Sequence, residues 1–279
     1  MQMYIRTHNQ LLDLSCPRVM AIINVTPDSF YTSCRSLSDT EVLTCAEQAI
    51  AQGADILDIG ACSTRPDATP VDSKTEWKRL EPALKAIRQH FPDAILSVDT
   101  FRSDIARRSL DDGADIINDV YGGEADDQMF DTIAHYHAPY ILTHAGAIPP
   151  ATNGYDNTLT QVLGFLQART DQLHRMGVAD VIIDPGFGFG KDVSQNYALL
   201  RQLHVLQTLH TPILVGMSHK SMFYRPLGLT PDDVLPATTA AHVIALQQGA
   251  NILRVHEVAP AKQAIAVYQL TYAQPCQSE

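Results

Sequence analysis

Three stretches, Gly53-Ala54-Asp55-Ile56, Gly113-Ala114-Asp115-Ile116 and Gly249-Ala250-Asn251-Ile252, repeat one pattern along the chain. A fourth, Gly177-Val178-Ala179-Asp180-Val181, is one residue longer. In each of them a glycine follows an amphipathic segment, and a short apolar run comes directly after it. Because glycine readily adopts the left-handed backbone conformation that ends a helix, each stretch predicts a turn from a helix into a strand.

Short apolar runs rich in Ile, Val and Leu are typical of parallel strands that are buried on both faces. Eight such runs alternate with helical patterns at about 31 residues per unit, the size of one βα repeat. They are residues 19–25, 56–59, 95–98, 116–117, 140–142, 181–183, 213–215 and 252–255. The sequence therefore predicts a single (β/α)8 TIM barrel over residues 19–272, with an N-terminal extension over 1–18 and a C-terminal tail over 273–279. The alternative is an open doubly wound sheet, but no Gly-x-Gly-x-x-Gly turn follows the first predicted strand.

Three segments carry the start signals of helices. Ser38 and Ser73 each stand three residues before a glutamate, which is the pattern of a capping box. Thr230-Pro231-Asp232-Asp233 places a proline at the first helical position. We expect helices to begin at these three places.

Composition narrows the class of protein. The chain has 279 residues with 20 Lys and Arg against 31 Asp and Glu, so its formal net charge is −11. This balance disfavours nonspecific binding to nucleic acid or to anionic membranes, which requires a basic face. No stretch approaches about 18 consecutive apolar residues, and the first 17 residues lack the apolar run of a signal peptide. The five cysteines are odd in number and lack Cys-x-x-Cys spacing, which predicts neither a disulfide framework nor a zinc site. We expect a cytoplasmic protein.

Polar side chains gather where the predicted strands end, while the turns before the strands carry the repeated Gly-Ala pattern. In a barrel of this kind the active site is built at the carboxyl ends of the strands. The asymmetry therefore predicts a catalytic barrel. The strand-end residues are Asn24, Asp58, Asp99, Asn118, Asp119, Thr143, His144, Asp184, Ser218, Lys220, Arg254 and His256.

Several candidates also have an ordinary structural interpretation. Asp99 could cap the helix that follows it, and Asn118 could satisfy a backbone group at a turn. Arg65 could be an exposed loop charge. A lone histidine such as His256 is often a buried structural residue, but its spacing from Arg254 places both side chains on one face of a strand.

Eight segments, spread from about residue 19 to residue 256, form an ordered set of motifs. They are Asn24-Val-Thr-Pro-Asp-Ser-Phe30, Gly53-Ala-Asp-Ile-Leu-Asp-Ile-Gly60, Ser63-Thr-Arg-Pro66, Ser97-Val-Asp-Thr100, Gly113-Ala-Asp-Ile-Ile-Asn-Asp-Val120, Asp184-Pro-Gly-Phe-Gly-Phe-Gly-Lys191, Gly216-Met-Ser-His-Lys-Ser221 and Arg254-Val-His256. One such motif can arise by chance, but the ordered set is specific. In this order it resembles the dihydropteroate synthase family.

The resemblance implies a transferase that joins p-aminobenzoate to 6-hydroxymethyl-7,8-dihydropterin diphosphate. The products would be diphosphate and 7,8-dihydropteroate, for folate synthesis. Diphosphate is expected to leave first, so that the amine attacks a pterin-methylene cation. The resemblance also implies Mg²⁺ as cofactor, a homodimer, and a target for sulfonamides.

The resemblance assigns roles to individual residues of this chain. It implies that Asp99, Asp184 and Lys220 are catalytic and that Asn24 is the Mg²⁺ ligand. Pterin diphosphate binding falls to Thr64, Asp99, Asn118, Asp184, Phe189, Lys220, Arg254 and His256. Binding of p-aminobenzoate falls to Phe30, Thr64, Arg65, Pro66 and Ser221. The chemistry agrees, because carboxylates can accept from the N–H groups of a pterin edge and an arginine can fork two phosphate oxygens.

The chain departs from the family pattern at several places. Its first loop reads Tyr31-Thr32-Ser33-Cys34 where an Asp-Gly-Gly stretch is usual, and Cys62 precedes the Ser-Thr-Arg-Pro motif. Thr143-His144-Ala145 replaces Met-His-Met, and Ser218-His219-Lys220-Ser221 replaces Ser-Arg-Lys-Ser. We expect these changes to affect the p-aminobenzoate side, with His219 weakening the grip on that substrate.

Three alternatives stay open at this point. A non-catalytic pterin-binding paralogue would keep the pocket and lack the acceptor chemistry. A methyltetrahydrofolate-binding methyltransferase-like barrel would share the pterin-reading acids but would not need Arg254 and His256. A class I aldolase would use Lys220 as a Schiff-base nucleophile.

Overall fold

The computed structural model describes residues 3–7, 9–26, 39–62, 71–149 and 157–272. Eight parallel strands form one sheet: β3 (Arg18–Asn24), β4 (Ile56–Gly60), β5 (Ile95–Asp99), β6 (Ile116–Asp119), β7 (Tyr140–Thr143), β8 (Val181–Asp184), β9 (Leu214–Gly216) and β10 (Ile252–Val255). Their order is β8-β7-β6-β5-β4-β3-β10-β9. A bridge between Ile183 and Ile213 joins the two edges, β8 and β9, so the sheet closes. The predicted barrel is confirmed, and the open sheet is excluded.

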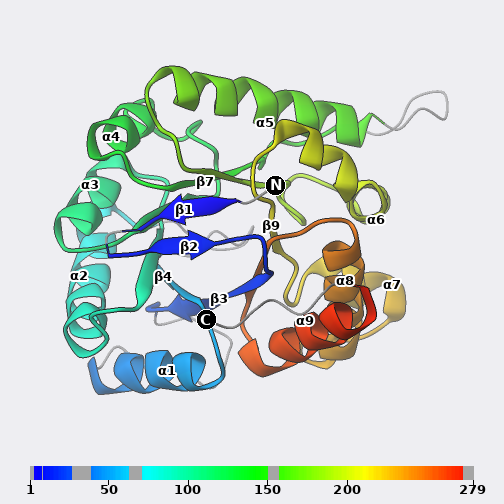
Figure 1. Ribbon diagram of the computed structural model, residues 1–279, viewed down its shortest axis with the longest axis horizontal. Coiled ribbons are helices and arrows are strands. Elements are labelled where there is room, and N and C mark those ends of the chain that lie inside the picture. Colours follow the sequence, from blue (N-terminus) through cyan, green and yellow to red (C-terminus); the bar gives the residue numbers. More distant parts are fainter. Residues whose placement is uncertain (1–2, 8, 27–38, 63–70, 150–156, 273–279) are drawn as a thin grey trace.

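Helices connect the strands and surround them (Figure 1). They are α1 (Asp39–Ala51), α2 (Ser73–His90), α3 (Ser103–Asp111), α4 (Met129–Tyr136), α5 (Thr158–Arg175), α6 (Val193–Arg201), α7 (Ser221–Leu227), α8 (Leu235–Gln247) and α9 (Val258–Tyr272), with the 3-10 helices η1 (Leu203–Leu209) and η2 (Pro231–Asp233). In the part of the chain described, no helix is long and apolar enough to cross a membrane.

The predicted helix start at Ser73 is confirmed, but its capping box and the predicted helix start at Pro231 need correction. The cap of α2 is Asp72, whose carboxylate accepts from the Thr75 N–H at 2.7 Å, so Ser73 is the first helical residue. Glu76 is not part of a capping box, because its buried carboxylate accepts from the Thr100 hydroxyl at 2.7 Å. Pro231 begins the short η2, and α8 starts only at residue 235. The third predicted cap, Ser38, lies outside the described residues.

The repeated Gly-Ala-Asx-Ile stretches form the turns that the sequence predicts. Gly53, Gly113 and Gly249 have φ values of 92°, 96° and 94°. The Asx residue adds a contact that the pattern alone does not show. Asp55 donates its backbone N–H to the Val19 carbonyl at 2.8 Å, and its carboxylate accepts the Val19 N–H at 2.8 Å. The same reciprocal pair joins Asp115 to Leu96 and Asn251 to Ile213. Each repeat therefore fastens one strand to the strand before it.

An antiparallel hairpin of β1 (Tyr4–Arg6) and β2 (Leu11–Asp13) lies across the middle of the view in Figure 1. Ile5, Leu12 and Leu14 are buried in a cluster with apolar side chains near the starts of the barrel strands. Those side chains are Met20, Ile56, Ile95, Ile116, Ile141, Ile182, Leu214 and Ile252. The hairpin thus covers the amino-terminal end of the barrel and leaves the other end to the polar residues.

The expectation that the cysteines form no disulfide is wrong for two of them. Cys16, just before β3, and Cys45, within α1, are disulfide-bonded. The odd number of cysteines and the lack of Cys-x-x-Cys spacing do not exclude individual disulfides.

Candidate active site

One row of paired residues crosses four strands at the carboxyl end of the barrel. Asn24 pairs with Gly60, Gly60 with Asp99, and Asp99 with Asn118. A Cβ added at Gly60 would lie 3.5 Å from the Asn24 Oδ1 and 3.5 Å from the Asp99 Cβ. The three polar side chains predicted for this site are therefore brought together, with a glycine leaving space between two of them.

Arg254, on β10, links the acids of this row. Its Nε donates to Asp58 Oδ2 at 2.6 Å, and its Nη2 donates to Asp99 Oδ2 at 2.5 Å. Asn118 Nδ2 donates to the same Asp58 oxygen at 3.0 Å. Asp58, in the middle of β4, has no role among those that the family resemblance assigns. It is fully buried, and its Oδ1 has no hydrogen-bond partner among the described residues.

The charges of this cluster do not balance, because two carboxylates share one guanidinium. Burial raises the pKa of Asp99 to about 7, the Arg254 charge opposes this rise, and the Asp58 charge adds to it. Burial lowers the pKa of Arg254, but the charges of Asp58 and Asp99 raise it more, so the guanidinium stays protonated. The cluster therefore favours ligands that bring hydrogen-bond donors or developing positive charge.

Asp184 ends β8 and faces the same opening. Its Oδ1 accepts the Gly186 N–H at 2.7 Å. Its Oδ2 lies 4.0 Å from the position that a Cβ would take on Gly216, and Arg254 side-chain atoms approach the same position. Burial raises the pKa of the Asp184 carboxyl, while the Gly186 N–H and the charge of Lys220 lower it. One carboxylate oxygen is thus fixed by the backbone, and the other faces the centre of the site.

Lys220 and Phe189 meet beside Asp184, as their predicted roles require. The Lys220 Nζ lies 4.2 Å from the centre of the Phe189 ring, a cation–π distance. Gly188, at φ 80°, makes this contact possible, because a Cβ there would lie 2.9 Å from Lys220 Cδ.

A buried lysine to which the family resemblance assigns no role holds the glycine-rich turn. Lys191 Nζ donates to the carbonyls of His144, Gly186 and Phe189 at 3.0, 2.9 and 3.0 Å. It also lies 3.0 Å from His144 Nδ1. Burial lowers the pKa of Lys191 to about 7 and that of His144 to about 4, so the neutral imidazole can accept from the ammonium. The sequence signal that could have indicated this role is the lysine at the end of the glycine-rich motif 184–191.

The predicted diphosphate residues Arg254 and His256 lie two positions apart on β10 and just beyond it. The His256 ring packs edge-to-face against His219, with ring centres 5.6 Å apart. His219 therefore lies next to the predicted diphosphate pair, and not only on the p-aminobenzoate side that its place in the motif predicts. Ser221 follows Lys220 at the start of α7.

Four predicted p-aminobenzoate residues, Phe30, Thr64, Arg65 and Pro66, lie outside the described residues, as does the altered first loop at 31–34. Their roles stay predictions.

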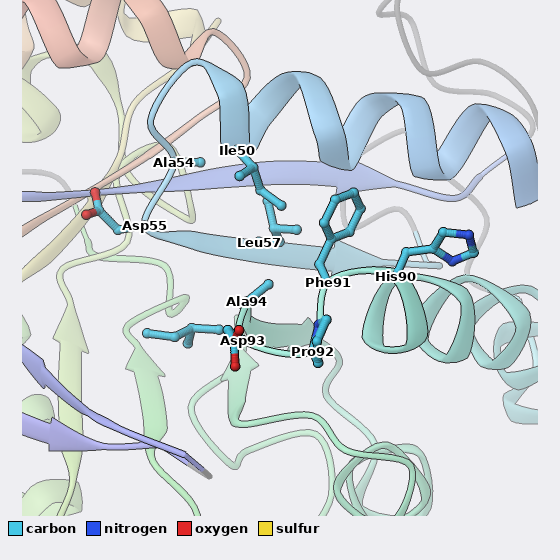
Figure 2. Close-up of a pocket in the computed structure, with 10 residues that line it drawn as sticks. Ile50, Ala54, Asp55, Leu57, His90, Phe91, Pro92, Asp93 and Ala94 are labelled. Carbon is cyan, nitrogen blue, oxygen red and sulfur yellow. The ribbon is translucent and has the colours of Figure 1, made fainter.

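A cavity of about 450 Å³ lies near the amino-terminal ends of β4 and β5, between α1 and the turn from α2 to β5 (Figure 2). Its lining is largely apolar and includes Leu57 and Phe91. Asp55, on its wall, is already paired with Arg18 at 3.1 Å and with Lys262 at 3.2 Å. This cavity is separate from the polar cluster at the strand ends.

Comparison with known proteins now identifies the family. Residues 20–256 match the family model described as pterin binding enzyme. The dihydropteroate synthase of Haemophilus influenzae is 37% identical over 274 residues, which cover 96% of this chain and 99% of that protein. The chain belongs to the dihydropteroate synthase family. The resemblance seen in the sequence and the expectation of a transferase are confirmed.

Solved structures of the family agree with this membership. The Yersinia pestis dihydropteroate synthase, in complex with a sulfonamide drug, has a TM-score of 0.88 at 36% identity and covers 96% of this chain and 99% of its own. The Xanthomonas albilineans dihydropteroate synthase, with 4-aminobenzoic acid, has a TM-score of 0.88 at 35% identity and covers 99% and 100%.

Proposed function

We propose that this protein condenses 6-hydroxymethyl-7,8-dihydropterin diphosphate with p-aminobenzoate to give 7,8-dihydropteroate and diphosphate. The observation that carries the proposal is the meeting of two acids, Asp99 and Asp184, with two cations, Lys220 and Arg254, at one end of the barrel. This set offers acceptors for a pterin edge and positive charge for a departing diphosphate, and the family supplies the reaction.

The pterin half of the site centres on Asp184. Its Oδ2 is the oxygen that the Gly186 N–H does not occupy, and it can accept from the adjacent N–H donors of the pterin edge. In this proposal Lys220, whose ammonium lies over the Phe189 ring, donates to the pterin carbonyl, and Phe189 stacks on the pterin. Asp99 and Asp184 also stabilise the positive charge that develops on the methylene carbon as diphosphate leaves.

The diphosphate half uses Arg254 and His256. Arg254 is held by Asp58 through its Nε, so the remaining guanidinium N–H groups can exchange their contact with Asp99 for phosphate oxygens. Such an exchange releases the Asp99 carboxylate just when a cation forms beside it. Binding of the diphosphate and stabilisation of the cation are thereby joined in one arginine.

The oxygen donors at Asn24 fit Mg²⁺. The Asn24 Oδ1 and the Asp99 side chain flank Gly60, and amide and carboxylate oxygens are the ligands that Mg²⁺ prefers. The described chain contains no group of three or more His, Cys, Asp or Glu suited to a metal ion. Mg²⁺ keeps several waters and takes few protein ligands, so one or two oxygen donors suffice to hold it. When bound, Mg²⁺ would neutralise charge on the diphosphate.

The acceptor half comprises Phe30, Thr64, Arg65, Pro66 and Ser221. Support comes from the family, in which the Xanthomonas albilineans relative was solved with 4-aminobenzoic acid. We expect sulfonamides to compete with p-aminobenzoate for this half.

We further propose a homodimer formed through α8 and α9, in the cytoplasm. Ile244, Val267, Leu270 and Tyr272 on these helices are large apolar side chains with exposed fractions of 43%, 57%, 89% and 62%. Such a face on neighbouring helices favours association with a second copy. Light scattering during gel filtration tests the dimer, and Leu270→Glu should shift it toward the monomer.

The decisive experiment incubates the purified protein with pterin diphosphate and p-aminobenzoate, with and without Mg²⁺, and measures dihydropteroate and diphosphate by chromatography. We expect both products in equal amounts and only with Mg²⁺. Binding of pterin diphosphate without product, even at saturating acceptor, would establish the non-catalytic paralogue instead. Borohydride reduction with carbonyl compounds should leave the protein mass unchanged, because an adduct on Lys220 is expected only of an aldolase.

A further inference from the structure

His219 has an unusual backbone for its place in the fold. Its φ is 55°, a left-handed conformation that side-chain-bearing residues rarely adopt. In the described chain, the other non-glycine residues with positive φ are His137 and His210, which are the C-caps of α4 and η1. His219 ends no helix and lies in the turn that the Lys220 N–H closes on the Met217 carbonyl at 3.3 Å, and contacts of its side chain add to the hold on this backbone.

The two ring nitrogens of His219 both face oxygen atoms. Nε2 lies 2.7 Å from a carboxylate oxygen of Glu257, and Nδ1 lies 2.5 Å from the carbonyl oxygen of Pro231. A carbonyl and a carboxylate only accept hydrogen bonds, so both nitrogens must donate. A histidine ring donates from both nitrogens only as the imidazolium. The geometry therefore favours a positive charge at a position where the family usually has arginine.

This imidazolium connects two segments around the diphosphate side. Pro231 begins η2, and Glu257 follows His256 directly after β10. The His219 ring packs edge-to-face against the His256 ring and is almost completely buried, with 8% of its side chain exposed. We propose that His219 is a proton-dependent positioning residue, whose imidazolium joins the Pro231 turn to Glu257 and so fixes His256 toward the substrate diphosphate. This inference rests on the proposed function and deepens it.

The charged groups around His219 set the direction of the pH dependence. Glu257 contacts the ring from the end of β10, Asp232 adds negative charge from η2, and the titratable rings and amines nearby are His256 and Lys220. Burial lowers the pKa of His219, but the bonds to Glu257 and Pro231 and the acidic charges raise it more. A raised pKa means that the contact is complete below about pH 6.5 and is lost as the pH rises through the folded value.

The experiment measures binding of inorganic diphosphate with Mg²⁺ by calorimetry, between about pH 6 and pH 9, in the wild type, His219→Arg and His219→Gln. Arginine keeps its charge throughout this range, so His219→Arg reports the ionisation of the ligand and of other groups. We expect the wild type to lose about three- to tenfold more affinity across the range than His219→Arg, while His219→Gln binds weakly at every pH. Glu257→Gln should shift the wild-type transition to lower pH, and thermal melts confirm that each variant is folded.

Steady-state kinetics locate the effect within the site. The KM for pterin diphosphate should follow the same pH pattern as diphosphate binding. The KM for p-aminobenzoate of the wild type, divided by that of His219→Arg, should be the same at every pH. Equal pH slopes in the two proteins, no diphosphate binding at all, or an effect confined to p-aminobenzoate would each overturn the inference. A pH difference in diphosphate binding without any dihydropteroate would instead overturn the proposed synthase and leave the role of His219 standing.

Discussion

The two ends of the barrel use aspartates in opposite ways. At the amino-terminal end, Asp55 and Asp115 accept backbone N–H groups and pair with arginines, Asp115 with Arg88 at 2.6 Å. At the carboxyl end, Asp58 and Asp99 have side-chain partners and share one guanidinium. The first arrangement satisfies each acid permanently, because a backbone N–H of the sheet cannot leave. The second can exchange partners when a ligand arrives.

For these four acids the contrast separates structural from functional roles more clearly than burial does, whereas Asp184 combines the two, with one oxygen on the Gly186 N–H and the other toward the site. Asp115 and Asp58 are both buried, with exposed fractions of 7% and 0%. The kind of hydrogen-bond partner distinguishes the two roles, since side-chain contacts can be replaced by contacts to a substrate at little cost to the fold. Substitutions at the two ends should therefore have opposite consequences for activity and stability.

The largest effect is expected for Asp184→Asn at the carboxyl end of β8. An amide can place a donor against the pterin donors, so kcat/KM for condensation should fall by about 30- to 1000-fold, or ~2–4 kcal/mol. The melting temperature should change little. The matched control is Asp180→Asn, just before the same strand, whose side chain accepts from the Arg6 backbone. If the two variants have equal activity, the distinction between the ends fails.

A smaller effect, on stability rather than activity, is expected for Asp115→Ala. The change leaves the Leu96 N–H without the Asp115 carboxylate and removes the carboxylate partner of Arg88, which should lower the free energy of unfolding by about 1–3 kcal/mol. Urea denaturation measures this loss, and kcat of the folded protein should equal that of the wild type. Asp171→Ala, on the exposed surface of α5, serves as the control and should change neither quantity. A selective loss of kcat in Asp115→Ala would contradict the structural role.

The smallest effect is expected at the glycine turns. Gly177 has a φ of 88°, and a Cβ there would meet no atom within 4 Å. Gly177→Ala therefore isolates the cost of the backbone conformation and should destabilise the protein by about 1 kcal/mol in urea denaturation. Gly164→Ala, within α5 and also without neighbours, should instead stabilise it by about 0.5–1 kcal/mol. The same sign in both variants would show that the left-handed turn is not what requires glycine at 177.

The sequence predicts a structural feature correctly where neighbouring residues alone determine that feature. The apolar runs predict the strands, and the glycines predict the turns, because both depend on neighbouring residues. The meeting of Asp99 with Arg254 also follows, since strand ends of one barrel converge. Local pattern misleads at Glu76, where the spacing of a capping box coincides with a buried contact to Thr100.

The residues that the sequence did not place have partners from distant segments. Lys191 is buried only because His144 and the glycine turn surround it. His219 depends on Glu257, 38 positions away, so a comparison of motifs registers the loss of an arginine and not the new ion pair. Such roles require knowledge of which loops lie side by side.

The N-terminal hairpin has a consequence for the order in which the protein can fold. The Leu14 carbonyl accepts a hydrogen bond at 2.9 Å from the side chain of Asn251, 237 positions later in the chain. Ile5 and Leu12 likewise bury themselves against strands that include Ile252. During synthesis these first residues leave the ribosome long before their final partners exist. Their docking must therefore wait until β10 has emerged, and a nascent chain that ends before Asn251 exposes this apolar hairpin to chaperones and to other chains.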